Sequence, residues 1–187
     1  MRHSLFTSLG VALVLCAPAV AAPASVWTID KANSKIGFTG SMNGEAFGGS
    51  FRSWDANIAF DPKNLAGSKV VAIINVASIA TGDSTRDEAL PTADWFSAKA
   101  FPRAVFTAQS FKDLGGGRYQ AIGELSIRGV TRPLTLPFQL AINGNVAKMH
   151  GAVTIDRTWF GVGRGQWTTG DAVATKAPLD IWVTAHR

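Results

Sequence analysis

Residues able to perform acid–base or metal chemistry are few in this sequence. Apart from His3 close to the N-terminus, the histidines are His150, inside an expected strand, and His186, beside the C-terminus. Neither has a histidine or carboxylate at the spacing of metal ligands, so we expect structural histidines and no metal site. A Ser-His-Asp triad stays open, because its members need not be neighbours in sequence, although the nucleophile motif G-x-S-x-G is absent.

Acidic residues offer a second candidate for chemistry. Asp87 and Glu88, with Asp94 nearby, could be paired acids for proton transfer. We favour a simpler role, because carboxylates in a first helical turn accept hydrogen bonds from free N–H groups and favour the helix dipole. Residues 161–165 (GVGRG) resemble a phosphate loop, but no helix pattern follows them. We therefore predict no enzyme activity, no catalytic residues and no cofactor.

The N-terminal 21 residues have the layout of a secretory signal peptide. A basic start with Arg2 precedes an apolar run over residues 5–16 and a small-residue cleavage site at residues 19–21. We expect cleavage before Ala22, one domain over residues 22–187, and a periplasmic location. The only cysteine, Cys16, leaves with this segment, so no disulfide is expected.

Charge argues against nucleic acid as a partner. Loss of Arg2 lowers the formal net charge from +5 to +4, and the remaining lysines and arginines are scattered singly without a basic stripe.

Residues 81–106 (TGDSTRDEALPTADWFSAKAFPRAVF) alone carry helix patterns. Two overlapping capping-box patterns begin at Ser84 and Thr85, and Pro91 must end the helix that they open. Large aromatics follow, and they need a surface against which to bury. We therefore expect this segment to cover the open end of a barrel as a lid.

Two charged residues of that helix have an expected structural task. We expect Arg86 and Asp87 to tie the helix to neighbouring strands through a charge-assisted contact, with Arg157 as the candidate partner.

The rest of the chain is a series of strand patterns separated by turn residues. The glycines at positions 44, 48 and 49 indicate a loop or bend, and Pro133 and Pro137 indicate an edge or a bulge. The run over residues 70–79 is nearly all apolar, which is typical of a strand buried on both faces. Eight or nine strands joined by hairpins predict an all-β, antiparallel barrel. The expected strands are 26–30, 35–40, 51–60, 70–79, 104–111, 118–128, 134–142, 149–155 and 179–186.

Apolar stripes define the walls of an expected tunnel, because side chains of one parity point to the same face of a strand. Six Trp and eleven Phe exceed what a narrow barrel needs for filling, which favours an apolar ligand cavity. The expected ligand-binding residues are Ile58, Phe60, Ile74, Val76, Phe106, Leu136 and Phe138 in the walls, Phe96, Phe101 and Phe160 at the mouth, and Arg86 and Arg157 beside it.

Several ordered blocks resemble the YceI-like, or lipid/polyisoprenoid-binding, family. They are WTID near the start, SIATGD, TRDEALPTADWFSAKAFPRAVF, GELSIRGVTRPLTLPF and RTWFGVG. The resemblance implies an extended, lipocalin-like antiparallel barrel of about eight strands with a short helical segment near its mouth. It further implies an exported protein that holds a long apolar chain, such as a polyisoprenoid or a fatty-acid derivative, in an internal tunnel.

Two positions depart from the family pattern. Asn33 precedes Ser34 where many members have a histidine, and residues 41–43 contain none. Members without these histidines resemble a subgroup associated with membrane cytochrome b, which implies a partner in quinone-linked electron transfer.

Three classes of function follow. The expected one is a periplasmic carrier, in which burial contributes about 0.8 kcal/mol per CH₂ group. The second is an enzyme acting on a lipid head group, which needs Arg86, Asp87 and Arg157 to converge. The third is an interaction module, such as an electron-transfer accessory or a glycan binder with a row of exposed tryptophans. The lipid and the oligomeric state stay open, a homodimer included.

Overall fold

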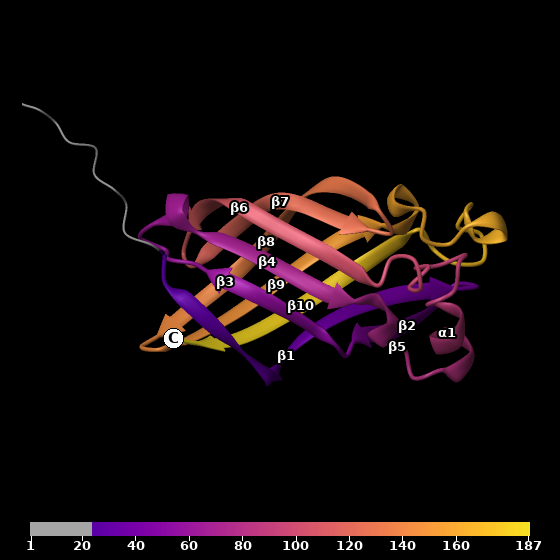
Figure 1. The fold of residues 1–187 in the computed structure, drawn as a ribbon, viewed down its shortest axis with the longest axis horizontal. Helices are drawn as coiled ribbons and strands as arrows, with labels where there is room; N and C mark the ends of the chain where they lie inside the picture. Colours follow the sequence, from indigo (N-terminus) through magenta and orange to yellow (C-terminus); the bar gives the residue numbers. More distant parts are fainter. Residues whose placement is uncertain (1–23) are drawn as a thin grey trace, which may run out of the picture.

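Eight strands close into an antiparallel barrel (Figure 1), and residues 24–187 are those that the computed structural model describes. The ring closes because the last strand pairs with the first. In ring order the strands are β1 (Val26–Met42), β3 (Trp54–Ala59), β4 (Lys69–Asn75), β6 (Arg103–Gly115), β7 (Arg118–Ile127), β8 (Val130–Asn143), β9 (Val146–Asp156) and β10 (Lys176–His186). The predicted fold class is confirmed. The predicted signal peptide lies outside the described residues.

Shorter elements gather at one end of the barrel, which we call the lid end; the opposite one is the far end. Within residues 24–187 no helix is long and apolar enough to cross a membrane. The short elements are β2 (Glu45–Phe51), β5 (Ile79–Ala80), the helix α1 (Ser84–Ala89) and the 3-10 turns η1 (Leu65–Gly67), η2 (Val76–Ser78), η3 (Arg157–Phe160) and η4 (Gly165–Trp167), of which η1 alone lies at the far end.

The first strand corrects the sequence prediction of two strands separated by a turn. Residues 26–42 form one strand whose register with β10 shifts between Asp30 and Lys35. The Asp30 carboxylate accepts hydrogen bonds from the backbone N–H groups of Ala32 and Asn33, so the turn chemistry makes a bulge instead. The bulge changes the parity of the inward side chains, which are Trp27 before it and Ile36 after it.

Two predicted strands are in fact interrupted. The expected strand 51–60 breaks at Arg52 and Ser53, between β2 and β3. The expected strand 70–79 ends at Asn75, whose side chain accepts a hydrogen bond from the Ala77 N–H and starts η2. It is not buried on both faces either, since within β4 only Ile74 is fully buried.

Glycines at positions 48 and 49 belong to β2 and do not form the predicted loop. A Cβ on Gly49 would lie 2.2 Å from Cζ of Phe38, so the missing side chain makes room for that ring from the neighbouring strand.

The barrel wall divides at the lid end between β8 and β9. These strands pair only from Phe138 and Gly151 towards the far end. Residues 130–137 of β8 pair with β7 alone, and the last residues of β9 pair with β10 alone. The edge predicted from Pro133 and Pro137 is thereby confirmed, and β8 begins earlier than expected, at Val130. The turn η3 follows β9 at this divergence.

Candidate functional site

An apolar cavity of about 180 Å³ lies inside the barrel. Its wall consists of apolar side chains. The buried indole N–H of Trp27 donates a hydrogen bond to the carbonyl of Phe60 at 2.9 Å. Such a wall excludes charged or strongly polar ligands from the interior. The lining residues are Trp27, Ile36, Trp54, Ala56, Ile58, Phe60, Val70, Ala72, Ile74, Phe106, Phe111, Ala121, Leu125, Leu134, Leu136, Phe138, Leu140, Ile142, Ala147, Met149, Val153, Leu179, Ile181, Val183 and Ala185.

Most of the lining residues follow from the alternation of side chains along each strand. On β8 every second residue from Leu134 to Ile142 faces the cavity, and on β10 the same holds from Leu179 to Ala185. In β6 a register shift between Ala108 and Ser110 changes the inward parity, so that both Phe106 and Phe111 face in.

Aromatic rings gather towards the far end of the barrel. The Phe60 ring contacts Phe111, Tyr119 and Phe138 edge-on, with centroids 5.2, 5.6 and 6.0 Å away. Tyr119 and Phe138 stack on each other at 5.5 Å. With the buried Trp27, these rings form the far-end cluster.

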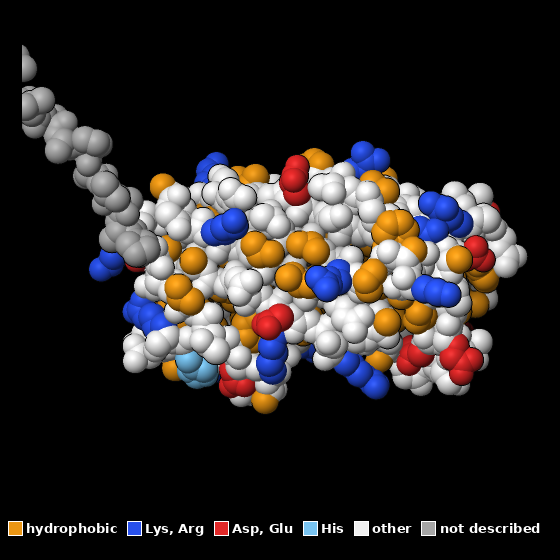
Figure 2. Space-filling view, viewed as in Figure 1, with side chains coloured by type: hydrophobic (Ala, Val, Ile, Leu, Met, Phe, Trp, Pro, Cys, Tyr) orange, Lys and Arg blue, Asp and Glu red, His pale blue; other side chains and the backbone are white. Residues whose placement is uncertain are grey.

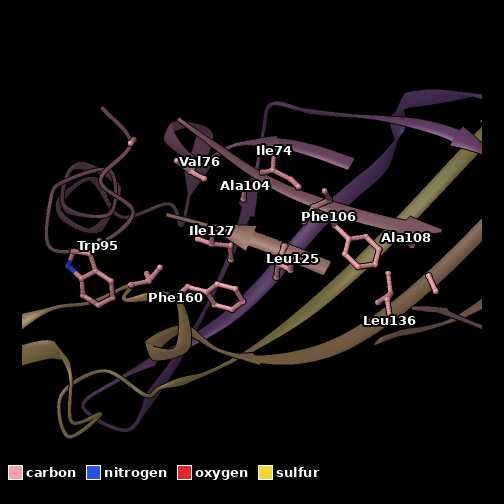
Figure 3. Packing of buried hydrophobic residues seen from close by; sticks show 14 of the residues in the cluster. Ile74, Val76, Trp95, Ala104, Phe106, Ala108, Leu125, Ile127, Leu136 and Phe160 are labelled. Atoms are coloured by element: carbon pink, nitrogen blue, oxygen red, sulfur yellow. The ribbon is translucent and has the colours of Figure 1, made fainter. Parts of the chain in front are cut away.

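A second hydrophobic cluster lies at the lid end. In Figure 3 Ile127 and Phe160 lie beyond the cavity-lining Leu125 and Leu136, and Trp95 lies further out. The Trp95 ring also packs on Trp167 at 5.6 Å. We call the buried residues Val76, Trp95, Ile127, Phe160 and Val162 the lid-end cluster.

The structure divides the twelve predicted ligand-binding residues into two sets. The set that lines the cavity is Ile58, Phe60, Ile74, Phe106, Leu136 and Phe138; the set that does not is Val76, Phe96, Phe101, Phe160, Arg86 and Arg157. Val76 was expected on a central strand, but it is in η2 and belongs to the lid-end cluster. Contact of either set with a ligand stays a prediction.

The three expected mouth aromatics all lie at the lid end, in different surroundings. Phe160 is buried, whereas Phe96 is half-buried and meets Phe51 edge-on at 6.0 Å. Phe101 is 38% exposed, and its ring covers Gly129, where a Cβ would lie 2.9 Å from Cε1.

The helix α1 is capped differently from the prediction. Its N-cap is Asp83, whose carboxylate accepts from the Arg86 N–H at 3.0 Å, rather than Ser84 or Thr85. The helix ends before Pro91, as predicted. Asp87 accepts from the N–H and the hydroxyl of Thr81, both at 2.7 Å. These bonds hold the pKa of Asp87 below its ordinary value, the hydroxyl contributing most.

Arg86 and Arg157 have partners other than those expected. The Arg86 guanidinium stacks 4.4 Å from the Phe47 ring centroid and lies 3.6 Å from Asp83. Arg157 is buried and donates only to backbone carbonyls; it does not contact Asp87, so the predicted pair is wrong. The polar constellation that an enzyme would need is therefore not assembled by these three residues.

Histidines occupy the outer face of the barrel. His150 Nε2 lies 2.7 Å from the Asp180 carboxylate, and its ring stacks on Trp182 with centroids 3.9 Å apart. Within residues 24–187 no group of three or more His, Cys, Asp or Glu residues could hold a metal ion.

Tryptophans do not form an exposed row. Trp27 and Trp95 are buried, Trp54 and Trp167 are half-buried, and Trp159 and Trp182 are exposed. Lys176 covers Trp159 at 5.3 Å, and His150 covers Trp182. The exposed-tryptophan surface of the interaction-module hypothesis is thus absent from the described chain. The face in Figure 2 shows basic side chains scattered singly, with acidic ones near α1 at the lid end and others over the rest of the barrel.

Some wall residues were missed from the sequence although their pattern was available. The stripe Leu179, Ile181, Val183 and Ala185 alternates cleanly and lines the cavity. Ile36 and Phe111 could not be assigned in this way, because each lies beyond a bulge that changes the parity.

A family model described as the YceI-like domain matches residues 27–185. A UPF0312 protein of Vibrio parahaemolyticus is 31% identical over 148 residues, which cover 78% of this chain and 77% of the relative. A UPF0312 protein of Vibrio vulnificus is 32% identical over 139 residues, covering 73% and 72%.

Solved structures share the fold. Burkholderia cenocepacia BcnA superposes with a TM-score of 0.81 at 30% identity, covering 84% of this chain and 99% of that one. A polyisoprenoid binding domain from Saccharophagus degradans gives a TM-score of 0.69 at 17% identity, covering 86% and 97%. The Campylobacter jejuni YceI protein gives 0.64 at 26% identity, covering 74% and 84%.

Proposed function

Since the chain belongs to the YceI-like domain family, we propose that it is a binding or carrier protein for a long apolar lipid of the polyisoprenoid or fatty-acyl type. The observation that carries the proposal is the cavity, whose wall is apolar throughout. A wall of this kind favours hydrocarbon over any polar ligand, at about 0.8 kcal/mol for each CH₂ group that it takes from water.

The volume of the cavity limits the size of ligand that the barrel can hold without rearrangement. An apolar cavity of roughly 150 Å³ admits a molecule as large as benzene. The volume of about 180 Å³ therefore accommodates a short part of a lipid chain. We infer that a longer chain requires other side-chain rotamers in the far-end or lid-end cluster.

The fold shared with the polyisoprenoid binding domain of S. degradans supports the isoprenoid class of ligand. The basic, apolar and small-residue order of residues 1–21 supports export to the periplasm. A membrane cytochrome b partner stays a prediction from the family resemblance, and the oligomeric state stays open, a homodimer included. We propose binding without catalysis, because Arg157 is committed to backbone carbonyls and Asp87 to Thr81.

Lipid mass spectrometry tests the proposal. The mature chain is purified gently from the periplasm, and its organic extract is compared with that of the same protein after delipidation and refolding. We expect one class of long-chain lipid at near-stoichiometric amount in the first sample, and rebinding of that lipid by the second. A protein that carries no lipid and binds neither farnesol nor palmitic acid would contradict the carrier function.

A further inference from the structure

Two arginines are buried at the lid end, and their hydrogen bonding differs. Arg157, 7% exposed, uses all its guanidinium nitrogens. Its Nε donates to Ala174 O at 3.0 Å, Nη1 to Val162 O at 2.8 Å and Nη2 to Val173 O at 2.7 Å, with further contacts to the carbonyls of Gly163 and Trp167. This pattern describes a structural residue whose donors are satisfied by the fold itself.

Arg128 is 8% exposed and lacks such partners. Its Nη1 donates to the Trp95 carbonyl, and its Nε is buried without any acceptor in residues 24–187. No carboxylate of the described chain lies within ion-pair distance of it. A buried donor without an acceptor costs about 1 to 3 kcal/mol, and more when it is charged. The fold thus holds this arginine in place without satisfying it.

The backbone position makes the arginine more unusual. Arg128 and Gly129 form the two-residue loop of the β7–β8 hairpin, and both have positive φ, 54° and 76°. Asn-Gly or Asp-Gly is the favoured pair in a loop with positive φ at both residues. Arginine is therefore not the residue that the turn itself would select.

The free edge of Arg128 has a definite shape. Because Nη1 is engaged, the remaining donors are Nε–H and the Nη2–H₂ group, which point the same way in the guanidinium plane. Two parallel N–H donors of this kind match the two oxygens of a carboxylate or a phosphate.

The surrounding charge favours an anion. Burial lowers the pKa of Arg128 below its ordinary value, and the nearby Arg164 lowers it further, whereas Asp94 opposes them. Asp94 is exposed, and among the described residues it forms no ion pair with Arg128. An anion at the free edge would replace the missing countercharge.

We propose that this edge of Arg128 binds one oxyanion, a carboxylate or a phosphate, at the polar end of the bound lipid. The assignment to a lipid rests on the proposed function. Leu125, which lines the cavity, precedes Arg128 by three residues on the same hairpin, roughly 10 Å along the strand. Ile127 and Phe160 belong to the lid-end cluster, so this cluster would have to rearrange for a chain to reach from the cavity to Arg128. The barrel then holds the hydrocarbon while the lid end selects the head group.

The experiment measures the affinity of the delipidated mature protein for farnesol, farnesyl monophosphate and inorganic phosphate. The variant is Arg128→Asn, which suits the turn, and the matched control is Arg103→Asn. Arg103 is exposed at the start of β6, at the same end of the barrel, so both changes remove one positive charge. Arg128→Lys is the second variant, because it keeps the charge and lacks the paired donors.

For the wild type and the Arg103→Asn control we expect farnesyl monophosphate to bind about 10- to 100-fold more tightly than farnesol. This advantage should disappear in Arg128→Asn and shrink in Arg128→Lys. The melting temperature of Arg128→Asn should equal or exceed that of the wild type, because a buried unpaired charge is removed.

Other results separate the two proposals. If Arg128→Asn still binds farnesyl monophosphate more tightly than farnesol by the wild-type factor, or if this variant loses much of its stability, the oxyanion site is overturned. Binding of farnesol would still support the carrier function. Failure of both isoprenoids to bind the wild type overturns the carrier function and the lipid assignment together. In that case, stabilisation by inorganic phosphate of the wild type and not of Arg128→Asn assigns the site to a free anion, and no stabilisation overturns the site as well.

Discussion

The far half and the lid half of the barrel differ in backbone regularity and in the kind of interaction that holds them together. The far half is continuous strand pairing, interrupted by bulges, around apolar side chains whose rings meet at Phe60. The lid half contains most of the 3-10 turns, the divergence of β8 from β9, and the two buried arginines. A cavity wall needs only alternating apolar residues, whereas an entrance needs backbone that departs from regular pairing.

The comparison suggests a division of labour. Hydrophobic burial in the far half is non-directional, so it provides affinity for hydrocarbon without distinguishing between chains of equal length. Directional hydrogen bonds and charge occur in the lid half, where Arg128 and Arg157 lie. Discrimination between ligands of equal chain length should therefore depend on the lid half alone.

The largest expected effect tests whether the lid half is held by polar contacts. Arg157→Met keeps an apolar side chain of similar length but leaves several buried carbonyls without donors. We expect the free energy of unfolding to fall by about 3 kcal/mol or more, measured by urea denaturation. Arg164→Met is the control; since that side chain is exposed, it should cost less than about 0.5 kcal/mol. Equal effects of the two would show that the carbonyl contacts contribute little.

A smaller effect tests the far half. Phe138 lines the cavity and stacks on Tyr119, and Phe138→Trp adds atoms that can enter the cavity. We expect a stability loss below about 1 kcal/mol, less than the 1 to 3 kcal/mol typical of an overpacked core. The chain length of co-purified lipid should decrease, as measured by mass spectrometry.

Gln139→Trp is the matched control, because it adds the same ring at the next position of β8, on the exposed face. It should leave the lipid unchanged. Severe destabilisation by Phe138→Trp with unchanged lipid would mean that the cavity does not hold the chain.

Much of the far half could be predicted from the sequence, because its pattern is short-range. The stripe through Leu136 and Phe138 has period two, and a strand's side chains must follow it. Pro137 did not disturb this parity, because β8 is unpaired on its β9 side up to that residue. Parity did fail beyond the bulges at residues 30–35 and 108–110, where three extra residues in β1 and one in β6 reverse the faces.

The lid half could not be derived in this way. Arg157 and Arg128 look alike in sequence. They differ only in the fold, where carbonyls from residues 162–174 accept all the hydrogen bonds of Arg157, whereas in the described chain Arg128 has the carbonyl of Trp95 alone. The capping prediction failed for a similar reason, because Asp83, Ser84 and Thr85 are all good N-cap residues. The choice among them depends on Thr81, whose hydroxyl donates a hydrogen bond to the Asp87 carboxylate.

The smallest expected effect concerns this last contact. Asp87 is ionised in its bonds to Thr81, and those bonds, with a weaker contribution from Arg52, hold its pKa below the ordinary 3.8. Its charge therefore stabilises the fold above that pH, and the contribution is lost as the pH falls through the lowered pKa. Asp87→Asn should melt at a slightly lower temperature than the wild type at neutral pH. The two melting curves should converge in acid, because protonation makes the wild-type side chain as neutral as the amide. If the difference between them persisted unchanged at the lowest pH, the Thr81 bonds would depend on shape rather than on charge, and the docking of α1 would be as insensitive to pH as the far half.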